Sequence, residues 1–344
     1  MATNLLEAPA QILDGRFSAR PATLDDVEAA VAMFNAYARS LLGIDQFTAE
    51  GYRNEWQVPG LNLETDVQVV TTLDGQIVGC TEVWDVADPH VRINVWGRVH
   101  PDYQGRGIGS AMLGWAEERA RQAIPKAPEG ARVTMFSRAI SVDAGADPLL
   151  RQAGFELIRH SYLMAIDLEA PPPAPAWPEG IALRTLVVGQ DERATVQAVR
   201  DAFRDHWGHV ERPFEDDLQH WLHFIQNDGT FDPTLWFLAM DGDQIAGVSL
   251  CWLRSQEDPQ LSWVGTLGVL RPWRRQGLGL ALLLHSFGEF YRRSQRKVGL
   301  GVDASSLTGA TRLYERAGMR VERLYNTYEK ELRPGIELST QSIT

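Results

Sequence analysis

Gln104-Gly105-Arg106-Gly107-Ile108-Gly109 and Arg274-Arg275-Gln276-Gly277-Leu278-Gly279 are the two stretches of the sequence that decide its fold. An apolar, strand-like run precedes each stretch, and a helical pattern follows it. The N-terminus of a helix presents unpaired backbone N–H groups, and glycine lets a diphosphate approach the backbone closely. Each stretch therefore predicts a strand, an anion-binding turn and a helix. Neither has the spacing of a Rossmann fingerprint or the lysine of a P-loop.

The same landmarks occur twice along the chain, in the same order and at a nearly constant offset. They are strands at Phe17–Arg20 and Ile181–Arg184, helices at Leu24–Ala38 and Asp191–Phe203, hairpin turns at Asp74-Gly75 and Gly242-Asp243, the two glycine-rich stretches, and helices that end at Gly154 and Gly318. Repetition at this length indicates a duplicated domain rather than a short-period solenoid.

We predict two domains, at residues 17–168 and 181–332, with tails at 1–16 and 333–344. Residues 169–180 form the linker, because the run from Glu169 to Pro178 is proline-rich and should be extended and semi-rigid.

Within each copy, most strands precede the glycine-rich turn, which indicates a mixed α/β fold with consecutive hairpin strands. The expected elements are strands at Val91–Val99, Gln244–Leu253 and Leu261–Leu270, and helices at Ile108–Arg121 and Leu278–Arg292.

Bulk properties narrow the function. The formal net charge is -12 and the sequence pI is near 5.2, whereas proteins that bind nucleic acid concentrate positive charge on one face. A cationic or neutral small molecule suits this balance better. No segment reaches the apolar length needed to span a membrane, and Met1–Gln11 does not read as a secretion signal.

The chain has two cysteines, Cys80 and Cys251, each in an apolar run and without a Cys or His partner at metal-ligand spacing. We therefore expect a reducing, cytoplasmic environment and no metal.

The glycine-rich turns resemble those of the GNAT superfamily of N-acetyltransferases, written Gln/Arg-x-x-Gly-x-Gly/Ala. Gln104, Gly107 and Gly109 match in the first copy, and Arg274, Gly277 and Gly279 match in the second. The resemblance covers nearly the whole chain, and the tandem arrangement is similar to that of mycothiol synthases. It implies two GNAT-type domains, each with a mostly antiparallel central sheet that is splayed at its middle and flanked by helices.

The resemblance also implies acetyl-CoA as co-substrate. The turn would bind its pyrophosphate, and the strand before the turn would pair with the pantetheine arm. The implied contacts on that strand are Leu267, Gly268 and Val269 in the second copy and Gly97, Arg98 and Val99 in the first. Those in the turns are Arg274, Arg275, Gln276, Gly277, Leu278 and Gly279, and Gln104, Gly105, Arg106, Gly107, Ile108 and Gly109.

Many members of the family carry Asn-x-x-Ala-x-x-x-Tyr, whose tyrosine protonates the departing thiolate of CoA. Ala310 and Tyr314 match this pattern, whereas Leu307 replaces the asparagine. Leu150 stands at the tyrosine position of the first copy, where Tyr162 is the nearby substitute. The second copy is therefore the expected catalytic domain. From helical spacing alone, Tyr314 is better explained as a core residue that packs against the sheet.

The general base is open. Relatives place a glutamate before the turn, but Leu261–Thr266 has none. Asp303 is one candidate and could instead cap a helix that starts near Ser306. His206 and His209 have a suitable ordinary pKa, although a histidine in a loop is more often a surface residue, and Trp207 could form a pocket wall.

We expect an N-acetyltransferase that transfers acetyl directly from acetyl-CoA to a primary amine of a small molecule, mainly in the second domain. No cysteine stands where a covalent acyl-enzyme would need one. The expected partners are that amine, and neither nucleic acid nor membrane; the protein would be a monomer or a homodimer. The alternative is a non-catalytic CoA-binding sensor or partner-binding module.

Overall fold

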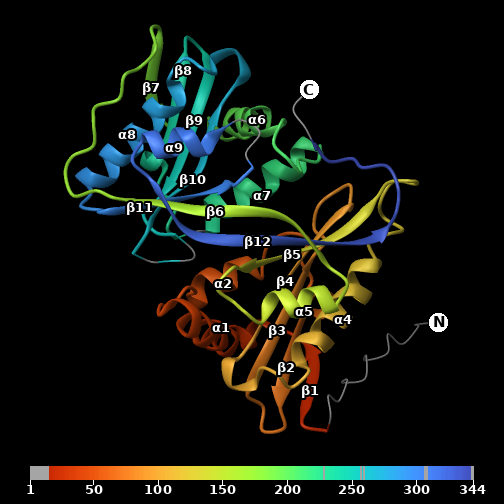
Figure 1. Cartoon of the computed structure of the whole chain (residues 1–344). Coiled ribbons are helices and arrows are strands. Elements are labelled where there is room, and N and C mark those ends of the chain that lie inside the picture. Colours follow the sequence, from red (N-terminus) through yellow and green to blue (C-terminus); the bar gives the residue numbers. More distant parts are fainter. Residues whose placement is uncertain (1–14, 228, 256–257, 259, 306–308, 342–344) are drawn as a thin grey trace. The chain divides into compact units, whose positions relative to one another are not determined.

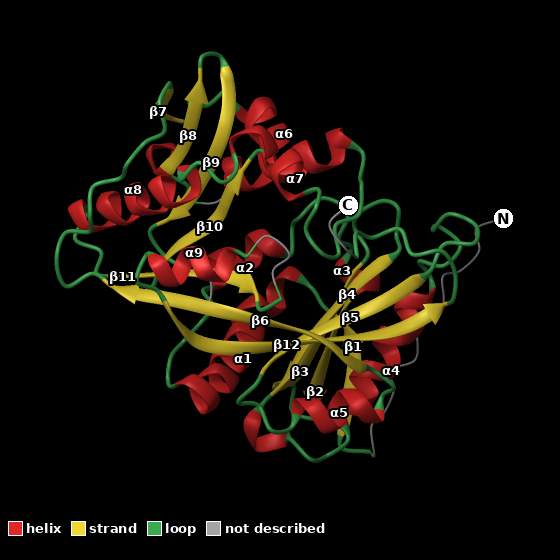
Figure 2. Ribbon diagram, turned by 45° about the horizontal axis from the view of Figure 1, so that its top comes forward, coloured by secondary structure: helices red, strands yellow, loops and turns green. Residues whose placement is uncertain are grey.

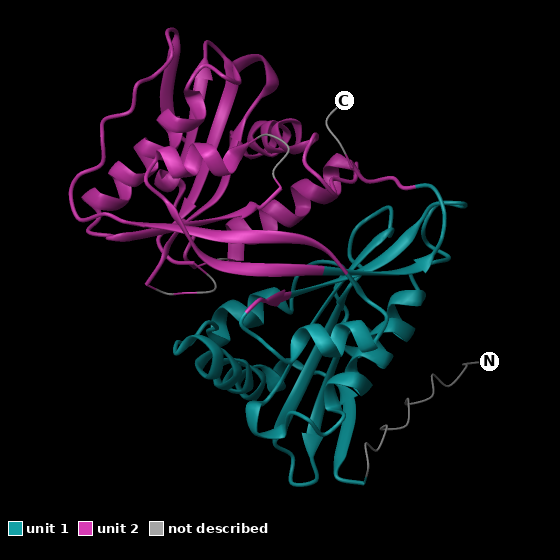
Figure 3. Ribbon diagram, in the orientation of Figure 1, with its two compact units in different colours: residues 1–138, 142–156, 328–336 teal, residues 139–141, 157–327, 337–344 magenta. Residues whose placement is uncertain are grey.

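The computed structural model describes residues 15–227, 229–255, 258, 260–305 and 309–341 (Figure 1). The chain divides into two compact units (Figure 3). Unit 1 comprises Met1–Arg138, Val142–Glu156 and Tyr328–Ile336, and unit 2 comprises Ala139–Ser141, Leu157–Thr327 and Glu337–Thr344. Among the helices of the described residues, none is long and apolar enough to cross a membrane.

Unit 1 contains a sheet with helices on both of its faces. Its strands are β1 (Phe17–Pro21), β2 (Val67–Thr72), β3 (Ile77–Trp84), β4 (Arg92–Val99) and β5 (Val133–Ile140), and its helices are η1 (Leu24–Asp26), α1 (Val27–Leu42), α2 (Ala49–Glu55), α3 (Leu63–Asp66), η2 (Pro101–Tyr103), α4 (Ile108–Arg121) and α5 (Ala146–Gln152). β1 to β4 pair antiparallel in sequence order, and β4 pairs parallel with β5.

Alternation along β2 shows how the helices cover unit 1. Val69 packs in one cluster with Phe34 of α1, whereas its neighbour Val70 packs with Ile108 and Met112 of α4. Successive side chains of a strand point to opposite faces, so α1 and α4 lie on opposite sides of the sheet.

Unit 2 repeats this order of elements (Figure 2). Its strands are β7 (Ile181–Thr185), β8 (Trp236–Asp241), β9 (Gln244–Trp252), β10 (Ser262–Val269) and β11 (Lys297–Asp303), and its helices are α6 (Glu192–Phe203), α7 (Phe214–Asn227), η3 (Pro233–Leu235), η4 (Arg271–Trp273), α8 (Leu278–Arg292) and α9 (Ala310–Arg316). Again the hairpin strands pair antiparallel, and β10 pairs parallel with β11. The predicted mixed α/β duplication is confirmed, and α4 and α8 span the residues that the sequence predicted.

The last strand of each copy extends into the other copy's unit. β6 (Glu156–Asp167) pairs antiparallel with β11, from Lys297↔Asp167 to Asp303↔Ser161. β12 (Arg320–Arg333) enters unit 1 from Tyr328 onward. The hydrogen-bonded strand order is β1-β2-β3-β4-β5-β12-β6-β11-β10-β9-β8-β7. The compact units are therefore not the continuous ranges 17–168 and 181–332, because hydrophobic periodicity predicts a strand but not which sheet it joins.

The proline-rich stretch runs along unit 2. The Trp177 ring lies 5.9 Å from the His285 ring of α8, measured between centroids, and Pro172 lies against Gly288 of the same helix. The segment that was predicted as a linker is therefore packed on α8.

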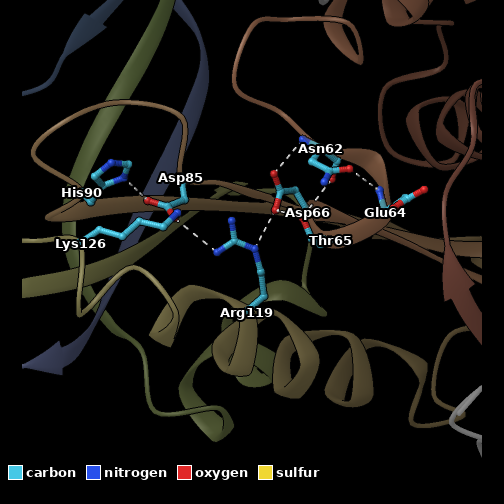
Figure 4. A network of polar contacts seen from close by, with 8 residues as sticks. All are labelled: Asn62, Glu64, Thr65, Asp66, Asp85, His90, Arg119 and Lys126. Atoms are coloured by element: carbon cyan, nitrogen blue, oxygen red, sulfur yellow. Dashed lines mark hydrogen bonds and ion pairs between the residues drawn. The ribbon is translucent and has the colours of Figure 1, made fainter. Parts of the chain in front are cut away.

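A buried ion network ties α4 of unit 1 to α3 and to the end of β3 (Figure 4). Arg119 Nε donates to Asp66 at 2.7 Å, and Arg119 NH1 donates to Asp85 at 3.4 Å. Asp85 also accepts from Lys126 Nζ at 2.8 Å and lies 2.7 Å from His90 Nδ1. A buried charge needs such partners to offset its lost hydration. The network therefore fixes how α4 lies against the rest of unit 1.

Candidate cofactor and acceptor site

The two glycine-rich turns have the same backbone. Gly107 and Gly277 are the N-caps of α4 and α8, with left-handed φ angles of 81° and 87°. Two positions further on, a Cβ on Gly109 would lie 2.9 Å from the Leu149 side chain, and one on Gly279 would lie 3.1 Å from Leu313. Glycine is therefore needed for conformation at the first position and for close helix packing at the second.

The strand before each turn separates from its parallel neighbour. The register of β10 with β11 ends at Trp263↔Gly299, although β10 continues to Val269. β4 pairs with β5 only from Arg92↔Thr134 to Asn94↔Phe136 and continues to Val99. Each sheet is thus splayed at its middle, as predicted. Beyond that point, the strand ahead of the turn can offer backbone groups to a ligand instead of to β5 or β11.

Arg274 uses its side chain within the protein. Its guanidinium donates to the Val269 carbonyl at 2.9 Å, to the Ala202 carbonyl at 2.9 Å and to Asp205. Burial alone would raise the pKa of Asp205, but the hydrogen bonds and charge of Arg274 hold that pKa below its usual range. The Arg274 side chain thus ties the end of α6 to the turn. We do not assign it a direct phosphate contact.

Arg275, in the second turn, has a cationic side chain and an unusual backbone conformation. Its φ is 62°, in the left-handed region that glycine prefers, and Gly105 has the equivalent position and a φ of 72° in unit 1. An arginine held there costs conformational energy that a glycine avoids, and strain of this kind concentrates at functional sites.

Tyr314 lies on α9. The residue before it on the same helix, Leu313, contacts the turn at Gly279. The Tyr314 side chain is 8% exposed, and burial raises its pKa to about 12. Among the residues that the structure describes, the phenol has no hydrogen-bond partner. It is therefore protonated near neutral pH and able to donate. Leu307, which the sequence places at the asparagine position, lies outside the described residues.

Asp303 lies at the end of β11, where it is engaged by other groups. It pairs with Arg159 of β6, and its Oδ1 accepts from the Ser305 backbone N–H at 2.8 Å. Asp303 is thus held by Arg159 and by the Ser305 backbone, whereas α9, the first helix after it among the described residues, begins at Ala310.

His206 is half-buried in the segment after α6. Burial lowers its pKa below the ordinary value; the charge of Asp205 opposes this shift, and that of Arg274 adds to it. His206 is therefore neutral near pH 7 and can accept a proton. The Nε2 atom of His209 lies 3.3 Å from a carboxylate oxygen of Glu211.

Unit 1 differs at the tyrosine position. Leu150 is 5% exposed and has no hydroxyl to offer. The predicted substitute, Tyr162, belongs to unit 2, where it packs against the core that contains Tyr314. That prediction was wrong because β6 leaves its own copy.

The sequence reading missed two polar features of unit 1. Asp143 accepts from the Tyr37 hydroxyl, and it stands three residues before Ala146, as the asparagine does in the Asn-x-x-Ala pattern. That spacing could have identified it. Glu82 is 2% exposed and accepts from Trp56 Nε1 and Trp84 Nε1 at 2.9 Å each. It lies on a strand that otherwise reads as apolar, and no motif marks it.

Neither cysteine has the surroundings of a reactive thiol. Cys80 and Cys251 are buried, and burial raises the pKa of Cys251 to about 11. A thiol with a raised pKa is scarcely ionised at neutral pH, and the thiolate is the reactive form. The site thus contains no group suited to a covalent acyl-cysteine.

Comparison with known proteins gives the same reading. Residues 196–319 match the model of the acetyltransferase (GNAT) family, and residues 65–157 match that of an acetyltransferase (GNAT) domain. The mycothiol acetyltransferase of Thermobispora bispora is 32% identical over 225 residues, which cover 64% of this chain and 70% of that protein. The chain belongs to the GNAT acetyltransferase family. The GNAT match occurs twice, so it has two GNAT domains.

Other GNAT relatives align over greater lengths. The mycothiol acetyltransferase of Streptomyces griseus is 28% identical over 309 residues, with 87% of this chain and 91% of that protein covered. A GCN5-related N-acetyltransferase from Sphaerobacter thermophilus has 38% identity and a TM-score of 0.77, covering 95% and 99% of the two chains. A tandem GNAT protein from the clavulanic acid biosynthesis pathway has a TM-score of 0.70 at 17% identity, over 93% and 100%, which shows a shared fold.

Proposed function

We propose that this protein transfers an acetyl group directly from acetyl-CoA to a primary amine of a small molecule, and that unit 2 performs the transfer. The observation that carries the proposal is Tyr314, a buried and protonated phenol on a helix that contacts the turn at Gly279. Unit 1 has the same turn but Leu150 in place of the phenol.

The residues of unit 2 fit acetyl-CoA. Gly277 gives the turn its left-handed bend, and the first N–H groups of α8 point out of the helix N-terminus, where an anion is stabilised. We assign the diphosphate to this turn, with Arg275 and Gln276 beside it. Leu267, Gly268 and Val269 lie beyond the end of pairing with β11, and we assign the pantetheine arm to this stretch, although Arg274 already occupies the Val269 carbonyl.

Acetyl-CoA, when bound, supplies an acetyl group on a thioester that an amine can attack. Backbone N–H groups of β10 stabilise the negative charge that develops on the carbonyl oxygen. The amine nitrogen bonds to the acetyl carbon as the carbon–sulfur bond breaks, and Tyr314 donates its proton to the sulfur. We assign acceptance of the amine proton to His206, directly or through water, because it is neutral and half-buried.

The acceptor is a primary amine. The curated relatives are named for mycothiol, so the acceptor of a mycothiol acetyltransferase is the first to try. We assign to unit 1 a turn able to hold CoA through Gln104, Gly105, Arg106, Gly107, Ile108 and Gly109, next to Val99, without transfer.

The test is calorimetric titration of acetyl-CoA into the wild type, Gly107→Glu and Gly277→Glu. Both glycines are left-handed with open space around a Cβ, so the two changes cost similar strain and control for each other. If only Gly277→Glu abolishes binding, unit 2 holds the co-substrate; if neither does, the proposal fails. Thiol release from acetyl-CoA in mixed amines separates an enzyme from a CoA-binding sensor, which would release none.

A further inference from the structure

The segment 204–209 of unit 2 connects the two strands that separate. At one end, α6 packs on β10 so closely that a Cβ on Gly268 would lie 2.9 Å from Ala202. Asp205 is bound there by Arg274. At the other end, the Trp207 ring contacts Arg159, which is paired with Asp303 of β11. The segment thus reaches from β10 to β11 beyond the end of their pairing.

One group that holds this segment comes from the first copy of the repeat. Arg159, on the exchanged strand β6, places its guanidinium carbon 4.5 Å from the centre of the Trp207 ring. Its Nε binds Asp303, and its NH2 donates to the Ser305 carbonyl at 3.1 Å. A single side chain therefore fixes both Trp207 and the end of β11.

The other holding group is the C-terminal segment. The Gly208 N–H donates to the Thr340 carbonyl at 2.7 Å, and the Thr340 N–H donates to the His209 carbonyl at 2.8 Å. The Trp207 indole N–H donates to Gln341 Oε1 at 3.0 Å, and the Thr340 hydroxyl donates to the Arg204 carbonyl at 3.2 Å. Residues that the sequence assigned to a tail thus pair with 204–209 as a short added strand would.

Four carboxylates around the segment are each paired with an arginine. Asp201 pairs with Arg204, Asp205 with Arg274, Glu211 with Arg200, and Asp303 with Arg159. His206 is neutral near pH 7. A polycation would find no uncompensated carboxylate among these groups, and an amine on an uncharged scaffold needs none.

We infer that Arg159 and Thr340–Gln341 are positioning residues for the acceptor, and that they make unit 2 selective for a primary amine on an uncharged scaffold over a polyamine. This inference rests on the proposed function. The positioning residues hold Trp207 and His206 across the opening by which an amine reaches the thioester. Arg159 also neutralises Asp303.

The test compares glucosamine with spermidine as acceptors for the wild type, Arg159→Ala, Arg159→Lys, Gln341→Ala and a matched control. The control is Arg320→Ala, which removes an exposed arginine paired with Asp167 in the same unit. Arg159→Ala should raise the glucosamine KM about tenfold and shift the kcat/KM ratio about tenfold toward spermidine, because Asp303 becomes a free carboxylate. The acetyl-CoA Kd should stay within about twofold.

Arg159→Lys should restore most of the preference, because it keeps the charge beside Asp303, and Arg320→Ala should leave the preference unchanged. An unchanged acceptor ratio in Arg159→Ala would overturn the inference. Amide hydrogen exchange is an independent measurement. The backbone amides of 204–209 should exchange faster in Arg159→Ala and Gln341→Ala than in the wild type, whereas the amides of α8 should exchange at the wild-type rate in both variants. If the wild type acetylates neither amine nor any other, the proposed function fails, and the exchange data still decide whether these residues hold the segment.

Discussion

Units 1 and 2 share one backbone arrangement but differ in the side chains on and around the glycine-rich turn. Gly105 is replaced by Arg275 in the turn, Arg98 by Gly268 on the strand before it, and Leu150 by Tyr314 on the helix beside it. Unit 2 carries the phenol, and α6 packs directly on Gly268. In unit 1, the Arg98 guanidinium lies over the Tyr37 and Trp96 rings.

Unit 1 buries a carboxyl group where unit 2 has an apolar side chain. Glu82 and Leu250 are equivalent, because each stands three residues after a glycine of the same strand in the repeat, Gly79 or Gly247. Three aromatic side chains donate hydrogen bonds to the Glu82 carboxyl group, which is buried. Burial raises its pKa. Arg119 is likewise enclosed by carboxylates. A duplicated fold can therefore keep its scaffold while the two copies use their polar residues differently.

The largest expected effect is on the stability of unit 1. Arg119→Met leaves Asp66 and Asp85 buried with fewer cationic partners, and loss of one partner of such a pair costs about 3 to 5 kcal/mol. Arg293→Met in unit 2 removes an arginine paired with Asp232 and Glu289 at half-exposed positions and should cost below about 1 kcal/mol. Urea unfolding measures both. Equal losses would contradict the division of roles.

The next effect is on catalysis in unit 2. Tyr314→Phe removes the proton donor but keeps the ring in the core, so kcat should fall about 100-fold with little change in acetyl-CoA affinity. Tyr291→Phe, on α8, is the matched control and should leave kcat unchanged. Leu150→Tyr tests whether unit 1 lacks only the phenol. A wild-type kcat in Tyr314→Phe would remove Tyr314 from the mechanism.

A smaller effect concerns the second turn. Arg275→Gly removes a charge beside the proposed diphosphate and should weaken acetyl-CoA binding about tenfold. The same change relieves a left-handed φ, so the variant should lose no stability. Gly105→Arg makes the reverse exchange in unit 1. Titration calorimetry and thermal unfolding separate the two consequences, and tighter binding by Arg275→Gly would reject the phosphate role.

The smallest effect is a pH dependence of stability. Burial lowers the pKa of His206 in the folded state, so between that pKa and the ordinary value near 6.5 the unfolded chain binds more protons. Stability should therefore decrease as the pH falls below about 6.5. His206→Gln should reduce this slope, while Asp205, Arg274, Asp303 and His209, whose charges act on the ring, remain. An unchanged slope would show that His206 is not responsible.

Much of this could be predicted from the sequence because it depends on local rules. Glycine at a left-handed N-cap and apolar periodicity identify the two turns and the helices α4 and α8. Pairings between distant residues could not be predicted. Nothing near Arg159 indicates that it reaches Asp303, and nothing in residues 333–344 indicates that Thr340 binds His209. Arg274 shows the same limit, since its motif predicts a turn but not that Asp205 takes up its guanidinium.

The exchange of β6 and β12 governs the order in which this protein can be made. Unit 1 needs Tyr328–Ile336, which follow the last helix of the second copy, and unit 2 needs Leu157–Asp167 from the first copy. A ribosome that has released only the first copy has not yet supplied the strand that completes unit 1. Contacts so distant in sequence form slowly. Unit 1 therefore cannot be completed before the second copy has been made, and an mRNA truncated between the copies would yield a chain with an unpaired sheet edge, prone to aggregate.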